Sequence, residues 1–349
     1  MKEMYAAKKA KVLAGEEEEG MDLMGALVKG AAASESVEKS QAAQKQIFTD
    51  DDVLGNAFVF VVAGHETTAN SIHFSLLYLA LHVKSQRRLQ KDLDSNFHGR
   101  PVSEWDYDRD LPHLFGGMAG AVLNEELRLM PPVIAIPKKA SETSPQTFVV
   151  DGKKVHLQAG TSIYLVSTVV HRNPKYWPHG PPSDPAHPIH PASNLDNDLE
   201  EFKPDRWLLD SASPATTNPL TGNNNGTSNG HADSRHQLDK ADADADDLGV
   251  NTAADTAANL YHPPRGAYIP FSEGFRACLG RRFAQVEVLA VLAVIFSQYS
   301  VELAVDDFAT DEEVRGMDAG VRREVWGKAA ARARKLMSTG MGTVLTVSD

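Results

Sequence analysis

The chain has 349 residues and a formal net charge of −12 at pH 7, from 35 Lys and Arg against 47 Asp and Glu. This acidic balance, without a Lys/Arg-rich run interleaved with aromatics, argues against nucleic acid as a partner. The single cysteine excludes an intrachain disulfide. No window reaches the roughly 18 uninterrupted apolar residues of a membrane span. The chain as given is therefore expected to be soluble or only peripherally attached to a membrane.

Residues 1–47 are rich in Ala, Lys and Glu and are expected to form a helical or flexible segment. A long helix is then predicted to start at residues 49–52, where Thr49 and three Asp residues have the pattern of a capping box. From residue 53 to about residue 83 the sequence is apolar on nearly all sides, which predicts a buried helix.

The middle of that helix breaks the apolar pattern with Ala63-Gly-His-Glu-Thr-Thr68. Gly in a helix interior costs roughly 1 kcal/mol relative to Ala. A hydroxyl such as that of Thr67 can bond back to a carbonyl, and a buried carboxylate such as Glu66 needs a partner. The stretch is either a functional site or a kinked core helix with a satisfied polar cluster, and the residues alone favour neither.

A helix over about residues 85–97 is predicted next, followed by a loop that contains Pro101 and Pro112. The apolar helix from Met118 ends at a Pro pair. Its Glu125 and Arg128 lie one turn apart, which alone indicates a surface ion pair of little energetic value.

Alternating apolar residues and turn signals over residues 133–170 predict a small β-sheet with a hairpin. Residues 180–199 and 210–261 are polar and of low hydrophobicity, and are predicted to be disordered insertions. After residue 297 the sequence predicts a strand over residues 298–305, a charged helical segment over 311–336 and a final strand over 342–348.

The only cysteine lies in the stretch Phe271-Ser-Glu-Gly-Phe-Arg-Ala-Cys-Leu-Gly280. Gly274 and Gly280 let the backbone approach a large flat group, and a helix begins just after the thiol. A helix N-terminus and the nearby Arg276 favour the thiolate, which suits the axial ligand of a haem iron. The alternative is a buried Cys that acts as a small hydrophobe.

The complete spacing F-x-x-G-x-R-x-C-x-G resembles that of the cytochrome P450 family of haem-thiolate monooxygenases. G-x-E-T at Gly64, E-x-x-R at Glu125 and F-x-P-x-R-W at Phe202 precede it in the family's order. The resemblance covers about residues 48–300. It implies a mainly α fold with small β-sheets, matching the C-terminal two-thirds of the family's fold, with residues 48–349 as the haem-binding core.

The resemblance also assigns roles to residues. Haem b (iron protoporphyrin IX) would lie between the helix around Gly64 and the loop that carries its iron ligand, Cys278. The positions that would contact the cofactor are Ala63, Gly64, Phe271, Gly274, Arg276, Cys278 and Gly280. Glu66 and Thr67 would relay protons to oxygen, whereas Glu125, Arg128 and Arg206 would form an internal structural clamp. Lys138 departs from the Arg that many members use to reach a haem propionate.

The implied activity is insertion of one atom of O2 into an apolar small molecule. Electrons would come from an NADPH-cytochrome P450 reductase-type donor that docks near Arg281 and Arg282, on a monomer that looks fungal. A full-length relative would lie on the cytosolic face of the endoplasmic reticulum, and the chain looks N-terminally truncated. The alternatives are a peroxide-dependent or isomerase-type haem-thiolate enzyme, and a non-catalytic haem-binding fragment.

Overall fold

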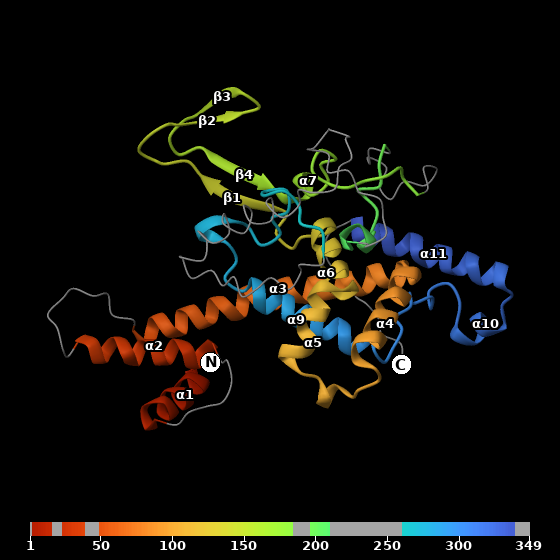
Figure 1. The fold of residues 1–349 in the computed structure, drawn as a ribbon, viewed down its shortest axis with the longest axis horizontal. Helices are drawn as coiled ribbons and strands as arrows, with labels where there is room; N and C mark the ends of the chain where they lie inside the picture. Colours follow the sequence, from red (N-terminus) through yellow and green to blue (C-terminus); the bar gives the residue numbers. More distant parts are fainter. Residues whose placement is uncertain (1, 16–22, 39–48, 184–195, 210–259, 339–349) are drawn as a thin grey trace, which may run out of the picture. The chain divides into compact units, whose positions relative to one another are not determined.

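The computed structural model describes residues 2–15, 23–38, 49–183, 196–209 and 260–338. The chain forms two compact units, Met1–Ala69 and Asn70–Asp349. Figure 1 labels the helices and strands of both. The predicted insertion at 210–261, except for its last two residues, most of the 180–199 segment and the predicted final strand lie outside the described residues. The domain boundary expected after residue 47 stays a prediction.

The first unit contains α1 (Lys2–Ala14), α2 (Leu23–Glu38) and the first part of α3 (Asp50–Leu81). Its small core is built from Tyr5, Val28, Ala31 and Val53. The capping box at the start of α3 is confirmed: the Asp52 backbone N–H donates to Thr49 Oγ1 at 3.2 Å, and the Thr49 N–H donates to Asp52 Oδ2 at 2.9 Å. These two bonds satisfy backbone donors that the first helical turn would leave unpaired.

The expected burial of α3 is wrong for its first half. Phe58, Val59, Val61 and Val62 are all more than half exposed. Within this unit the cluster formed with α1 and α2 includes Val53 and leaves these four side chains without cover. The second half of α3 behaves as predicted, because Leu77, Leu79, Ala80 and Leu81 are buried.

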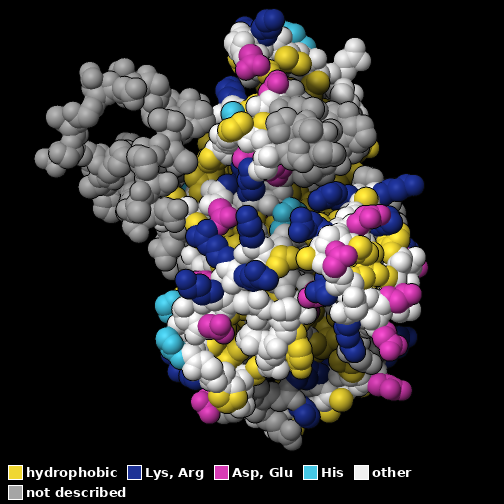
Figure 2. Space-filling view, turned by 90° about the vertical axis from the view of Figure 1, so that its right-hand side faces the viewer, with side chains coloured by type: hydrophobic (Ala, Val, Ile, Leu, Met, Phe, Trp, Pro, Cys, Tyr) yellow, Lys and Arg dark blue, Asp and Glu magenta, His cyan; other side chains and the backbone are white. Residues whose placement is uncertain are grey.

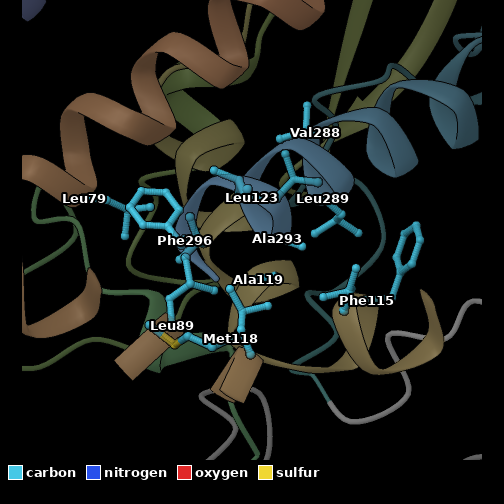
Figure 3. Close-up of a cluster of buried hydrophobic side chains, with 14 of the residues drawn as sticks. Leu79, Leu89, Phe115, Met118, Ala119, Leu123, Val288, Leu289, Ala293 and Phe296 are labelled. Atoms are coloured by element: carbon cyan, nitrogen blue, oxygen red, sulfur yellow. The ribbon is translucent and has the colours of Figure 1, made fainter. Parts of the chain in front are cut away.

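The core of the second unit lies where α4 (Val83–Phe97), α5 (Tyr107–Gly116), α6 (Met118–Leu129) and α9 (Arg281–Phe296) meet the end of α3. Figure 3 shows Leu123 of α6, Leu289 of α9 and Leu79 of α3 converging there. A smaller cluster joins α3 to α11 through Leu77, Leu81 and residues of α11. The remaining helical elements are η1 (Val102–Glu104), α7 (Ser167–Val170), η2 (Pro204–Trp207), η4 (Gly274–Arg276), α10 (Asp311–Gly316) and α11 (Ala319–Ser338).

Two antiparallel strand pairs complete the described fold. The strand β1 (Ala135–Lys139) pairs with β4 (Ser162–Val166), and β2 (Gln146–Val150) pairs with β3 (Lys153–Leu157). The β2–β3 hairpin turns at Asp151 and Gly152, whose φ angles of 48° and 74° match the turn that a two-residue hairpin requires. The predicted fold class, mainly α with small β-sheets, is confirmed.

The loop predicted around Pro112 is instead the helix α5, which contains that proline. Asp106 caps the helix by accepting a hydrogen bond from the Arg109 N–H at 2.8 Å. Leu111, Leu114 and Phe115 are buried in the core. Tertiary packing of an apolar face therefore outweighs the local cost of a proline in the helix.

The strand predicted over residues 298–305 is also wrong, because this segment has no regular structure. The Gln86 side chain takes the place of a neighbouring strand at Val301. Its amide nitrogen donates to the Val301 carbonyl at 2.8 Å, and its amide oxygen accepts from the Val301 N–H at 3.0 Å. A buried side-chain amide thus satisfies backbone groups that would otherwise lack partners.

In the part of the chain that the structure covers, none of the helices is both long and apolar enough to cross a membrane. On the face shown in Figure 2, acidic and basic side chains lie interspersed with apolar ones.

Candidate functional site

The loop that carries Cys278 is held by its own backbone. The Cys278 N–H donates to the Phe271 carbonyl at 2.8 Å, and the Ala277 N–H donates to the Gly274 carbonyl at 2.9 Å. Gly274 has a φ of 76°, a conformation that glycine adopts at no steric cost. Ser272, with a φ of 61°, adopts it at some cost. The chain therefore doubles back and places the thiol three residues before Arg281, where α9 begins.

Three large apolar side chains that lie near this thiol in the sequence are exposed. Cys278 is exposed, and the exposed fractions of Phe275, Leu279 and Phe283 are 89%, 81% and 73%. A group of exposed apolar side chains on a folded surface marks a place where another molecule binds. Within the described ranges no cluster of three or more His, Cys, Asp or Glu side chains could hold a metal ion. A single exposed thiol near exposed apolar residues in the sequence fits a flat macrocycle held by one thiolate better than a metal held by protein ligands alone.

The structure brings Glu125, Arg128 and Arg206 together in one buried network, with Glu125 and Arg128 fully buried. Arg128 forms a two-pronged pair with Glu125, with N–O distances of 2.8 and 2.9 Å. Arg206 Nε donates to Glu125 Oε1 at 2.9 Å. Trp207 Nε1 and the Lys203 N–H donate to the same carboxylate at 2.8 and 2.9 Å. The pair is therefore not a surface ion pair.

The two arginines also bond to backbone carbonyls of distant segments. Arg128 Nη1 donates to the carbonyls of His171 and Leu199 at 3.1 and 2.8 Å. Arg206 donates to the carbonyls of Pro178 and Asp198 at 2.8 and 3.0 Å. The network thus bonds residues 171–178 and 198–207 to the helix α6. Among the described residues of these two stretches, η2 is the one helical turn.

The charge on Glu125 is stabilised despite complete burial. Burial alone would raise the pKa of this carboxyl group, but the Arg128 and Arg206 guanidinium groups outweigh it and lower the pKa to about 2. Charge-assisted, two-pronged hydrogen bonds of this kind are stronger than neutral ones. The carboxylate therefore stays ionised at neutral pH.

His171 links α6 to the segment that leads into the Cys278 loop, and the sequence offered no role for it. Its Nδ1 is 3.2 Å from the Arg128 carbonyl, and its Nε2 accepts a hydrogen bond from the Ile269 N–H at 2.9 Å. The side chain is fully buried, and its ring lies 5.2 Å from that of Tyr268. The only sequence signal is its place in His171-Arg-Asn-Pro, which resembles a connector of the family.

Glu126 is a second residue for which the sequence offered no role. It lies on α6 next to Glu125 and is fully buried, but neither of its carboxylate oxygens makes a well-formed hydrogen bond within the described residues. Burial raises the pKa of Glu126 well above its usual value, and the Ser71 hydroxyl offsets only part of that rise. Burial therefore favours the protonated form of Glu126 in the folded chain.

The predicted proton-relay residues lie in the first unit. Glu66 is exposed, and the Thr67 hydroxyl donates to the Ala63 carbonyl one turn earlier at 2.8 Å. A Cβ added at Gly64 would meet no other atom within 4 Å, so helix packing within the described chain does not require glycine there. The roles of Ala63, Gly64, Glu66 and Thr67 stay predictions.

The fold and the site together define a mainly helical protein with one exposed thiol on a glycine-containing loop, braced by a buried Glu–Arg–Arg network. The family model of cytochrome P450 matches residues 1–193 and 257–317, and the chain belongs to that family.

Curated relatives are similar at low identity. A cytochrome P450 monooxygenase of Arthrobotrys oligospora is 26% identical over 310 residues, which are 85% of this chain and 44% of that protein. Cytochrome P450 monooxygenase 124 of Postia placenta is 28% identical over 258 residues, 73% of this chain and 35% of that protein. Thromboxane-A synthase of Mus musculus is 32% identical over 139 residues, 40% of this chain and 24% of that protein.

Among solved structures, the heme domain of cytochrome P450DA matches with a TM-score of 0.49 and 19% identity, over 84% of this chain and 46% of that chain. This chain thus spans less than half the length of each of these relatives.

Replacing Arg128 by Ala is expected to lower the free energy of unfolding by roughly 3–5 kcal/mol, because it leaves a buried carboxylate with an unfilled partner position. Arg88→Ala is the matched control. It removes an exposed pair with Asp205 and is expected to cost less than about 1 kcal/mol. Chemical denaturation of both variants measures the difference. Equal losses would show that the Glu125 network does not brace the fold.

Replacing Glu126 by Met is expected to raise the free energy of unfolding at pH 7 by roughly 1–3 kcal/mol, the cost of a buried polar group without a partner. The folded chain binds the Glu126 proton more tightly than the unfolded chain does, because the pKa is raised well above its ordinary value of 4.5 on folding. The gain should therefore grow as the pH rises above 4.5 and fall, below that pH, to the smaller constant cost of the unpaired neutral carboxyl group. The exposed Glu104→Met serves as control in denaturation curves from pH 4 to 8. A gain that is independent of pH would contradict this interpretation.

Proposed function

We propose that this chain carries the haem-binding core of a haem-thiolate monooxygenase, with Cys278 as the axial ligand of haem b. The observation that supports this most is the exposed thiol of the only cysteine, on a loop that is fixed by its own backbone and carries the exposed Phe275 and Leu279. Membership of the cytochrome P450 family supports the same assignment.

The loop residues would hold the cofactor from one side. Phe271 and Gly274 accept the hydrogen bonds that shape the loop, so the thiol keeps its place without the metal. Arg276 is exposed on the same loop and offers a cation to the propionates, whereas Gly280 begins the helix that follows. When bound, haem would supply the redox chemistry that activates O2, with the Cys278 thiolate as its protein ligand.

Glu66 and Thr67 would supply protons for the reaction. The Thr67 hydroxyl donates its own proton to the Ala63 carbonyl, which leaves its oxygen lone pairs free to accept a proton from a water molecule or an acid. Glu66 is exposed and therefore able to exchange protons with solvent. The pair would act as a relay, and an apolar substrate would lie nearby.

Electrons would come from an NADPH-dependent reductase. Arg281 and Arg282 begin α9 directly after the Cys278 loop, where cations would attract an acidic protein surface. The Arg282 guanidinium lies 4.0 Å from the centre of the Phe115 ring, so the core orients it. If the same product forms with peroxide and without the reductase, the enzyme is peroxide-dependent.

Replacing Cys278 by Ser tests the ligation directly. The thiol is exposed, so the variant should keep the helical content of the parent chain while the red-shifted Soret band of the reduced CO complex is lost. Ala277→Ser is the control, because it adds a hydroxyl next to the ligand and leaves the thiol in place. A red-shifted band in the Cys278 variant would exclude this cysteine as the ligand.

Replacing Thr67 by Ala tests the relay. If Thr67 passes protons, the variant should still consume NADPH, but product should fall several-fold and hydrogen peroxide should rise. Thr67→Ser should restore most of the coupling because it keeps the hydroxyl, and Thr68→Ala controls for loss of a hydroxyl at the next position. Unchanged coupling in Thr67→Ala would mean that the hydroxyl only satisfies the Ala63 carbonyl.

A further inference from the structure

We propose that His171 is a positioning residue that fixes the Cys278 loop relative to α6, the helix that carries Glu125 and Arg128. This inference rests on the proposed function for its importance, since the loop position matters most if Cys278 binds haem. The residue lies outside the loop and outside the clamp, and neither motif identifies it.

The side chain bridges two segments that are far apart in the sequence. Its Nδ1 bonds to the Arg128 carbonyl at the end of α6, and its Nε2 bonds to the Ile269 N–H just before the loop. Its own backbone carbonyl accepts from Arg128 Nη1 at 3.1 Å. Arg128 therefore bonds to His171 at two points, and the His171 side chain in turn fixes the position of Ile269.

A short series of backbone bonds continues from Ile269 to the thiol. The Ile269 carbonyl accepts from the Ser272 N–H at 3.1 Å, and the Phe271 carbonyl accepts from the Cys278 N–H at 2.8 Å. Tyr268 adds a second tie to the same segment, because its hydroxyl donates to the Asn124 carbonyl of α6 at 3.2 Å. Two neighbouring residues before the loop are thus tied to α6, Tyr268 directly and Ile269 through His171.

The bridge fixes the chemical state of the ring. A backbone N–H only donates, so Nε2 must accept, and a carbonyl only accepts, so Nδ1 must donate. Only the neutral imidazole with its proton on Nδ1 makes both bonds. Arg128, Arg172 and Tyr268 are the charged or titratable groups that face the ring. Burial, followed by the Arg128 and Arg172 charges, lowers the pKa of His171 to about 4, so the bridge is intact at neutral pH.

Two substitutions separate the bond to Ile269 from mere packing. In His171→Asn the side-chain amide takes the place of Nδ1 and can still donate to Arg128, but it does not reach Ile269. In His171→Gln the longer side chain places an amide oxygen where Nε2 lies and can accept from Ile269. Both variants lose the ring contact with Tyr268, so they form a matched pair. His82→Asn is a further control, since His82 bonds to the Tyr78 carbonyl and lies off the loop.

The first measurement is hydrogen exchange by mass spectrometry on this chain at pH 7, which requires no haem. Peptides covering residues 266–280 should exchange about tenfold faster or more in His171→Asn, the scale expected for a buried donor left unpaired. Peptides of α4 and α5 should be unchanged. His171→Gln and His82→Asn should stay within about twofold of the parent in the loop peptides. Equal loop exchange in the Asn variant and the parent, or in the Asn and Gln variants, would overturn the proposal.

The second measurement is the reduced CO spectrum of the haem-loaded chain. His171→Asn should lose much of the red-shifted band at unchanged helical content, and His171→Gln should retain it. If the parent binds haem without that band, the proposed function fails, and the exchange data still decide the role of His171. If the parent shows the band and His171→Asn keeps it in full, only the inference about His171 fails.

Discussion

The described part of the second unit depends on one buried charge. The Glu125 carboxylate has no exposed surface, and four residues donate to it: Arg128, Lys203, Arg206 and Trp207. A carboxylate moved out of water without partners would take up a proton instead of staying charged. Here the bonds are numerous enough to keep it ionised, so the charge can organise the chain around it.

This network matters because the segment it holds has little structure of its own. Residues 198–207 contribute one short helical turn, η2, and their backbone carbonyls point at the Arg128 and Arg206 guanidinium groups. Trp177 and Trp207 pack edge to face beside them, with ring centres 5.2 Å apart. Replacing a buried ionic network by apolar residues is often neutral for stability, so its value here lies in fixing one arrangement of loops. The position of the Cys278 loop depends on that arrangement, because Tyr268 and Ile269, just before the loop, bond to Asn124 of α6 and to His171.

Much of this was predictable because the signals are local. The capping box at Thr49, the turn at Asp151 and Gly152 and the end of α6 at its proline pair all follow from short-range chemistry. The presence of Glu125, Arg128 and Arg206 in recognisable motifs allowed their grouping to be predicted, although no single spacing shows that they are buried.

What sequence could not give depends on contacts between distant residues. The Gln86 side chain takes the place of the strand partner expected for Val301. The burial of Leu111 and Leu114 stabilises a helix that contains Pro112. The bridge through His171 spans 43 residues to Arg128 and 98 to Ile269. Nothing in the sequence near His171 indicates either partner. The proton-relay role of Glu66 and Thr67 stays a prediction, because the contacts of the described residues do not test it.

The most direct test of the central role of Glu125 is to measure its ionisation in the folded chain. Carbon NMR of the labelled side-chain carboxyl group reports this ionisation while the pH is lowered. The pKa of Glu125 is about 2 in the folded chain, against an ordinary value of 4.5 for a glutamate side chain. This carboxylate therefore stabilises the fold above pH 4.5, and its contribution is lost as the pH falls toward 2. The account predicts that the Glu125 signal keeps its ionised chemical shift at every pH above about 3 at which the chain stays folded. A folded-state titration of Glu125 at pH 4.5 or higher would contradict it.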